Sequence, residues 1–121
     1  MHDQEHETQA RDAAEARGAR EAQTQSTNRA ANKVIHDRGD LAPLTEYGCE
    51  CTQKTCTVTV RLSVEEYAEA RALPTQFVIA VGHQRPDAER VVKKTDRYEL
   101  IEKLGDAAQL ATKLQSRAPQ K

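Results

Sequence analysis

The sequence predicts an α+β fold, a small and mostly antiparallel sheet with helices packed against it, over residues 28–117. Three observations predict this fold. Residues 57–62 alternate strictly between apolar and polar side chains, which is the period of a half-buried strand. Residues 75–81 are apolar on both faces, as in a buried strand. The apolar residues of 28–38 and 107–114 recur at helical spacing.

The first 27 residues differ in composition from the rest of the chain. Residues 1–27 contain charged residues, glutamines and alanines, but no Val, Ile, Leu, Phe or Tyr. Such a segment buries too little apolar surface to offset its ordering entropy, so we expect a flexible N-terminal arm. Its residues are good helix formers, so a helical arm that binds a protein partner is the alternative. Residues 118–121 are expected to form a frayed tail.

A short helix is expected over residues 28–38. Ala31, Val34 and Ile35 recur at helical spacing, and Gly39 can end the helix in a left-handed conformation. This helix should cover an edge or face of the sheet.

The middle of the chain predicts two strands that flank a helix. Residues 40–47 predict a connection and a short strand, and 57–62 predicts the next strand. Ser63 begins a helix, and Glu66 completes a capping box three positions later. Because residues 75–81 are apolar on both faces, we expect this strand in the middle of the sheet. If it pairs near residues 57–62, its end brings His83 beside the cysteines.

The C-terminal part predicts a hairpin and a helix. Residues 89–93 and 97–104 read as its two strands, with the turn at 94–96. Asp106 is expected to cap the last helix, with Gln109 at the capping-box position. The apolar residues of this helix lie on one face and should pack on the sheet: Ala107, Leu110, Ala111 and Leu114.

The clearest chemical motif is a group of cysteines with a distant histidine. Cys49, Cys51 and Cys56 follow a C-x-C-x4-C pattern, and His83 comes directly after the strand at 75–81. Thiolate and imidazole are the usual ligands of zinc, and three sulfurs with one nitrogen is a common structural set. The sequence therefore predicts one tetrahedral zinc site. With four protein ligands no position stays open for water, so we expect a structural role and no enzymatic activity.

Other interpretations of these residues stay open. The cysteines can be unrelated core residues, or a disulfide with one free thiol, and a single histidine is often an ordinary surface or core residue. A thiol-based redox sensor would release zinc on oxidation. A hydrolytic enzyme would need three protein ligands and water, but the H-x-E with P-C-x-x-C and H-E-x-x-H patterns are absent. We expect His2, His6 and His36 not to be ligands, and His36 to lie on the surface.

Five cations are candidates for contacts with a partner or an anion: Arg71, Arg85, Arg90, Lys93 and Lys94. Arg71 lies on the apolar stripe of its helix, where its stem can pack while the guanidinium reaches solvent. The other four belong to the predicted hairpin, where such charges often form a solvated face. A net charge of −1 and 3% aromatic residues give weak support to nucleic-acid binding.

Several motifs occur in a characteristic order over about the last two thirds of the chain. They comprise Cys49-Glu50-Cys51, Cys56, Leu62–Tyr67, Arg71, Pro74, Phe77, Gly82-His83, Pro86, Glu89–Val92, Tyr98 and Glu102-Lys103. In this order of motifs the chain resembles a family of small uncharacterised proteins from actinobacteria and relatives. That family has proline where this chain has Val81, and it has no assigned activity. The resemblance implies the extent of the domain and the cysteine and histidine ligands.

Compartment and role follow from the same observations. No apolar run approaches the ~20 residues of a membrane span, and the N-terminus lacks the hydrophobic segment of a signal peptide. We therefore expect a cytoplasmic protein without a membrane association, in a compartment where thiols stay reduced. Together the motifs predict a small zinc-binding regulatory or interaction module.

Overall fold

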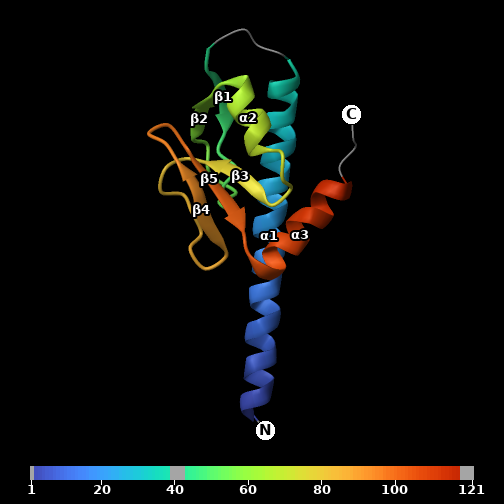
Figure 1. The fold of residues 1–121 in the computed structure, drawn as a ribbon. Coiled ribbons are helices and arrows are strands. Elements are labelled where there is room, and N and C mark those ends of the chain that lie inside the picture. Colours follow the sequence, from blue (N-terminus) through green and yellow to red (C-terminus); the bar gives the residue numbers. More distant parts are fainter. Residues whose placement is uncertain (1, 39–42, 118–121) are drawn as a thin grey trace.

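The computed structural model describes residues 2–38 and 43–117, and the side chains of 16–38 and 43–115. Figure 1 shows helices and strands in one α+β arrangement, which confirms the predicted fold class. The elements are α1 (His2–Asp37), β1 (Thr45–Gly48), β2 (Thr59–Leu62), α2 (Val64–Ala70), β3 (Gln76–Ile79), β4 (Glu89–Lys94), β5 (Glu99–Lys103) and α3 (Gly105–Arg117). The expected cap at Gly39 and the expected tail at 118–121 lie outside the described residues.

The strands form two small antiparallel sheets. Strands β1 and β2 make a two-stranded sheet, in which Thr45 lies opposite Leu62. The second sheet has the order β3-β5-β4, with Phe77 of β3 opposite Ile101 of β5. The hairpin of β4 and β5 was predicted from the sequence and is confirmed.

The expected place of β3 in the middle of the sheet is wrong. Strand β3 lies at an edge of its sheet, its sheet partner is β5, and it does not pair with residues 57–62. Strand β3 is nevertheless buried. Residues 48–56, which we call the cysteine segment, contact it: the backbone N–H of Glu50 donates to the carbonyl of Val78 at 2.8 Å. Apolar residues on both faces therefore do not identify a central strand here.

Helix α1 is one continuous helix from His2 to Asp37, so residues 28–38 do not form a separate helix. Its C-terminal half lies along the domain, and its N-terminal half extends beyond it (Figure 1). Ala22 and Gln25 are buried, so the docked part of the helix begins before residue 28. No helix in the described part of the chain combines the length and the hydrophobicity needed to cross a membrane.

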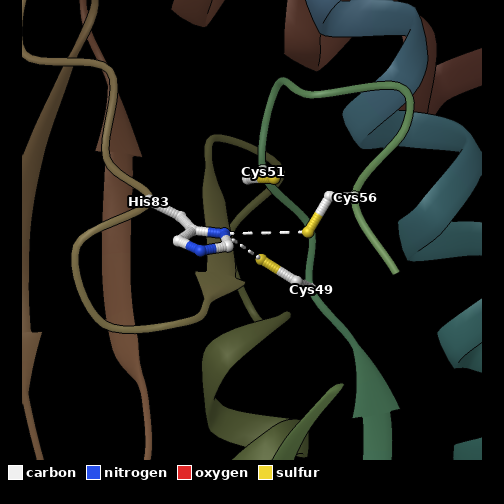
Figure 2. A group of neighbouring side chains, drawn as sticks. All are labelled: Cys49, Cys51, Cys56 and His83. Carbon is white, nitrogen blue, oxygen red and sulfur yellow. Dashed lines mark hydrogen bonds between the residues drawn. The ribbon is translucent and has the colours of Figure 1, made fainter. Parts of the chain in front are cut away.

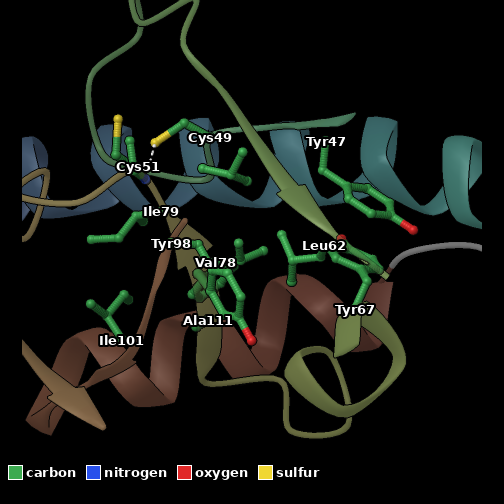
Figure 3. Close-up of a cluster of buried hydrophobic side chains, with 13 residues drawn as sticks. Tyr47, Cys49, Cys51, Leu62, Tyr67, Val78, Ile79, Tyr98, Ile101 and Ala111 are labelled. Atoms are coloured by element: carbon green, nitrogen blue, oxygen red, sulfur yellow. Dashed lines mark hydrogen bonds between the residues drawn. The ribbon is translucent and has the colours of Figure 1, made fainter. Parts of the chain in front are cut away.

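The core contains every aromatic residue of the chain, three tyrosines and one phenylalanine. Tyr47 of β1 stacks on Tyr67 of α2, with ring centroids 4.2 Å apart, whereas Phe77 and Tyr98 lie against the second sheet. Figure 3 shows this cluster between the sheets and the helices, with Cys49 and Cys51 at its border. All four rings are buried, so none is exposed as a stacking platform for a nucleic-acid base.

The ends of the two shorter helices differ in how well the sequence predicted them. The capping box of α2 is confirmed, because Ser63 Oγ accepts from the N–H of Glu66 while Glu66 Oε1 accepts from the N–H of Ser63. The expected cap at Asp106 is wrong. A cap at Asp106 would place the first helical residue at 107, but helix α3 begins at Gly105, which has a φ of 57°, and Asp106 lies in its first turn.

Glu66 also links α2 to the β4–β5 hairpin. Its carboxylate accepts from the Arg97 guanidinium at 2.9 Å. Arg97, together with the capping bond, lowers the pKa of Glu66 from 4.5 to about 2. A carboxylate with a lowered pKa stabilises the folded state above its ordinary pKa, and this contribution is lost as pH falls toward the folded-state value.

We predict that Glu66→Gln lowers the free energy of unfolding near neutral pH, since it removes the ion pair with Arg97. The difference from the unsubstituted protein should be constant above about pH 5 and shrink as pH falls from 4.5 toward 2. Urea unfolding at several pH values measures it. Glu65→Gln, at the exposed neighbouring position, is the control. A pH-independent difference for Glu66→Gln would contradict the role given to the ion pair.

Candidate metal centre

The cysteine segment continues from β1, and its alternate side chains lie in different places. Cys49 and Cys51 both belong to the metal cluster, whereas the Glu50 carboxylate lies in the core against Asn32, Tyr67 and Val78. Cys56 returns to the same place after a turn, which is closed by a hydrogen bond from its N–H to the carbonyl of Gln53 at 3.1 Å. The C-x-C-x4-C spacing thereby brings three sulfurs together.

A tight turn after β3 presents the histidine. The N–H of His83 donates to the carbonyl of Ala80 at 3.0 Å, which closes a four-residue turn. Gly82, the third residue of that turn, has a φ of 85°, a conformation that favours glycine. The N–H of Gly82 also donates to the Glu99 carboxylate at 3.0 Å, which fixes the turn against β5.

The four predicted ligands come together in the structure. The sulfurs of Cys49, Cys51 and Cys56 and a ring nitrogen of His83 all lie within 4.8 Å of one another. Figure 2 shows the imidazole facing the sulfurs through Nδ1, at 3.5 Å from Cys49 Sγ and 3.7 Å from Cys56 Sγ. A tetrahedral zinc ion, with Zn–S of about 2.3 Å and Zn–N of about 2.0 Å, separates sulfur and nitrogen by about 3.5 Å. The two printed sulfur–nitrogen distances are close to this value, and the four ligand atoms are close enough to hold one metal ion.

The protonation of the thiols depends on their burial. All three cysteines are free, so none forms a disulfide. Burial raises the pKa of Cys49 and Cys51, because a thiolate without a nearby cation is poorly solvated there. The backbone N–H of Ala80 donates to Cys49 Sγ at 3.1 Å, and such a bond stabilises a thiolate. A bound cation would supply the remaining stabilisation.

The site lies at the border of the core. Cys49 and Cys51 are buried, whereas Cys56 and His83 are half-buried. Two ligands therefore belong to the packed interior, and two lie where solvent reaches the metal site.

Glu50 is a site residue that sequence reasoning missed. Its side chain is buried opposite the sulfurs and accepts from Asn32 Nδ2 at 2.8 Å and from Tyr67 Oη at 2.6 Å. The N–H of Val78 donates to its second oxygen at 3.0 Å. Burial raises the pKa of Glu50, and these hydrogen bonds oppose the rise. Glu50 thus ties the cysteine segment to α1, α2 and β3.

Side chains of helix α1 also bind the backbone carbonyl groups of the cysteine segment. Asn32 donates to the carbonyl of Gly48 and accepts from its N–H, both at 2.8 Å, so its amide pairs with that backbone as a neighbouring strand would. Gln25 donates to the carbonyl of Glu50 at 3.2 Å, and Asn28 to the carbonyl of Cys49 at 3.4 Å. The backbone around two of the ligands is therefore fixed by three helix side chains.

These helix residues follow a pattern that the sequence does contain. Gln25, Asn28, Arg29 and Asn32 recur at helical spacing and form one stripe of α1. Arg29 donates to the carbonyls of Gln76 and Arg71. We call the four residues the polar stripe. The helical spacing of apolar residues does not reveal the polar stripe, because its side chains are amides and a guanidinium.

Arg71 and two of the hairpin cations contact aromatic rings or carboxylates of the same chain. Arg71 ends α2, and its guanidinium lies 5.9 Å from the centre of the Tyr67 ring. Lys93 Nζ lies 5.9 Å from the centre of the Tyr98 ring. Lys94 Nζ lies 3.8 Å from a Glu99 oxygen.

The other two candidate cations form ion pairs. Arg85 binds Glu21 of α1 at 2.7 Å and Asp87 at 2.8 Å, so it joins the β3–β4 connection to the helix. Arg90 binds Glu102 across the hairpin at 3.4 Å. None of the five lies in the metal cluster.

Besides His83, His36 is the histidine whose side chain the structure describes, and it is not part of the site. His36, which we expected on the surface, is half-buried: its ring centroid lies 5.5 Å from that of Tyr67, and Nε2 lies 3.2 Å from the carbonyl of Val64. The side chains of His2 and His6 lie outside the described ones.

Comparisons with protein-family models, with curated proteins and with solved structures found no match to this chain. The resemblance to the actinobacterial family therefore stays a prediction.

We predict that His83→Ala lowers the amount of metal bound, because it removes one of four ligands. Protein purified without chelator should contain close to one metal ion per chain, and the variant should lose it at a chelator concentration at least about tenfold lower. Elemental analysis after dialysis measures both. His36→Ala, a half-buried histidine outside the cluster, should keep the metal. Equal metal content in both variants would contradict the ligand set.

We predict that Glu50→Ala lowers the free energy of unfolding by about 3–5 kcal/mol, because it leaves the buried donors of Asn32, Tyr67 and Val78 without an acceptor. Denaturant unfolding of the metal-loaded protein measures it. Glu46→Ala, an exposed glutamate on the same segment, should change the stability by less than about 0.5 kcal/mol. A similar small change for Glu50→Ala would contradict the role of its carboxylate.

Proposed function

We propose that the protein is a zinc-binding regulatory or interaction module without enzymatic activity, in which zinc is structural. The observation that carries this proposal is the convergence of Cys49, Cys51, Cys56 and His83, with all ligand atoms within 4.8 Å of one another. Thiolates and imidazole favour zinc over magnesium or calcium, which prefer oxygen ligands.

The arrangement of the two sheets supports a structural role. Cys49 and Cys51 follow β1 of the two-stranded sheet, whereas His83 follows β3 of the three-stranded sheet. No strand is shared between the two sheets in the described residues. An ion bound by all four groups would join them, and its binding free energy would add to the free energy of folding.

The position of Glu50 supports a role without catalysis. A hydrolytic zinc site needs an open coordination position and a general base beside the metal-bound water. Glu50 is the carboxylate closest to the cysteines in the sequence, but it points into the core and accepts bonds from Asn32, Tyr67 and Val78. It is therefore occupied by structural hydrogen bonds.

The shape of α1 supports an interaction role. Its N-terminal half extends beyond the domain (Figure 1), which leaves a helical arm for a protein partner. The cytoplasm is the compartment we propose, since it keeps thiols free for metal binding. An origin in the actinobacterial family rests on the order of motifs described above.

A thiol-based redox sensor is the second candidate, and the half-buried position of Cys56 and His83 favours it. An oxidant that reaches Cys56 could convert its thiolate to a sulfenic acid or a disulfide and so release the metal.

We predict that removal of zinc with a chelator lowers the melting temperature by about 10 °C or more and that added zinc restores it. Thermal unfolding followed by circular dichroism measures the effect. Cys49→Ser, which removes a buried ligand, should show a low melting temperature with or without zinc. An unchanged melting temperature on metal removal would contradict the structural role.

A peroxide titration separates the two candidates. A structural site should release zinc slowly, whereas rapid release that a thiol reductant reverses would favour the sensor.

A further inference from the structure

A pocket of about 350 Å³ lies between α1 and the loop that carries the metal ligands. The pocket is lined by five residues on successive turns of α1 and by one residue of the loop: Arg20, Gln23, Thr24, Thr27, Asn28 and Lys54. The volume is at the lower end of the range for small-molecule sites, about 300–1,000 Å³.

Two of the residues that line this pocket are cations, and they come from elements far apart in the sequence. Arg20 belongs to α1, and Lys54 lies in the turn between Cys51 and Cys56. Both side chains are exposed, and neither has an ion-pair or hydrogen-bond partner for its charged group among the described residues. The hairpin cations and Arg71 differ in this respect, because each contacts a carboxylate or an aromatic ring of the same chain.

The rest of the lining is polar and uncharged. Thr27 and Asn28 offer a hydroxyl and an amide, and no acidic residue lines the pocket. The nearest carboxylate of α1, on Glu21, is paired with Arg85. The pocket therefore has net positive charge, with hydrogen-bond donors beside it.

The geometry points to a binding site for a small phosphate monoester, held between Arg20 and Lys54. A phosphate monoester carries about −1.5 to −2 charges at pH 7, which two cations can balance. The planar guanidinium can bind two oxygens at once, and the ammonium acts as a compact point charge. The uncharged residues would contact the ester's organic part.

This site is separate from the metal ligands, but it shares a loop with them. Lys54 lies between Cys51 and Cys56 in the sequence, and Asn28 donates to the carbonyl of Cys49 as well as lining the pocket. The zinc content of each sample must therefore be measured, so that a failure of the metal site is not mistaken for a failure of the phosphate site.

The test is a titration of the zinc-containing full chain with glycerol 3-phosphate, followed by amide chemical shifts, with glycerol as the neutral control. We expect saturable shifts at residues 20–28 and 54, with a dissociation constant of about 1 mM or lower. Arg20→Met and Lys54→Met should each weaken binding about fivefold at unchanged zinc content. Both side chains are exposed, so these variants should fold.

Arg61→Met and Lys113→Met replace exposed cations on other elements and should leave binding unchanged. Shifts that do not saturate, or equal binding in all four variants, would overturn the proposal. Tighter binding of a short oligonucleotide that depends on Arg20 and Lys54 would also overturn it, because the ligand would then be a nucleic-acid backbone.

Discussion

The buried carboxylate of Glu50 is the interaction on which the rest of the structure depends. A carboxylate without solvent is costly unless donors surround it, and here α1, α2 and β3 each supply one. Glu50 lies between two cysteines, and alternate side chains point to opposite sides of a chain, so fixing the Glu50 side chain also limits where both sulfurs can lie. The short segment around Glu50 therefore contributes to both the core and the candidate metal site.

The polar stripe of α1 explains how a helix with few apolar residues can dock. Its residues bind backbone carbonyls of the cysteine segment and of the β3 region, where a typical amphipathic helix would bury leucines. Directional hydrogen bonds of this kind fix the position of the segment along the helix. The helix thus positions the segment that carries Cys49 and Cys51, and a metal ion bound by the four-residue cluster would hold the same segment from the other side.

Sequence reasoning predicted the parts of the molecule that have a distinctive chemical or periodic signal. The fold class, the β4–β5 hairpin, the capping box of Ser63 and the approach of His83 to the cysteines follow from such signals. The place of β3 in its sheet was not predictable from its pattern, because apolar side chains indicate that the faces of a strand are covered and do not indicate how many strands pair with its edges. Glu50 and the polar stripe were missed because a polar residue gives no burial signal until its partners are known. The start of α3 at Gly105 depends on a positive φ at this residue, a conformation that glycine allows but that the sequence alone does not predict.

X-ray absorption at the zinc edge of the purified protein tests the four-ligand site most directly. Zinc bound by Cys49, Cys51, Cys56 and His83 should show three sulfurs at about 2.3 Å and one nitrogen at about 2.0–2.1 Å, with the nitrogen contribution lost in His83→Ala. Absence of bound zinc, or a shell of oxygens with fewer than three sulfurs, would contradict this site.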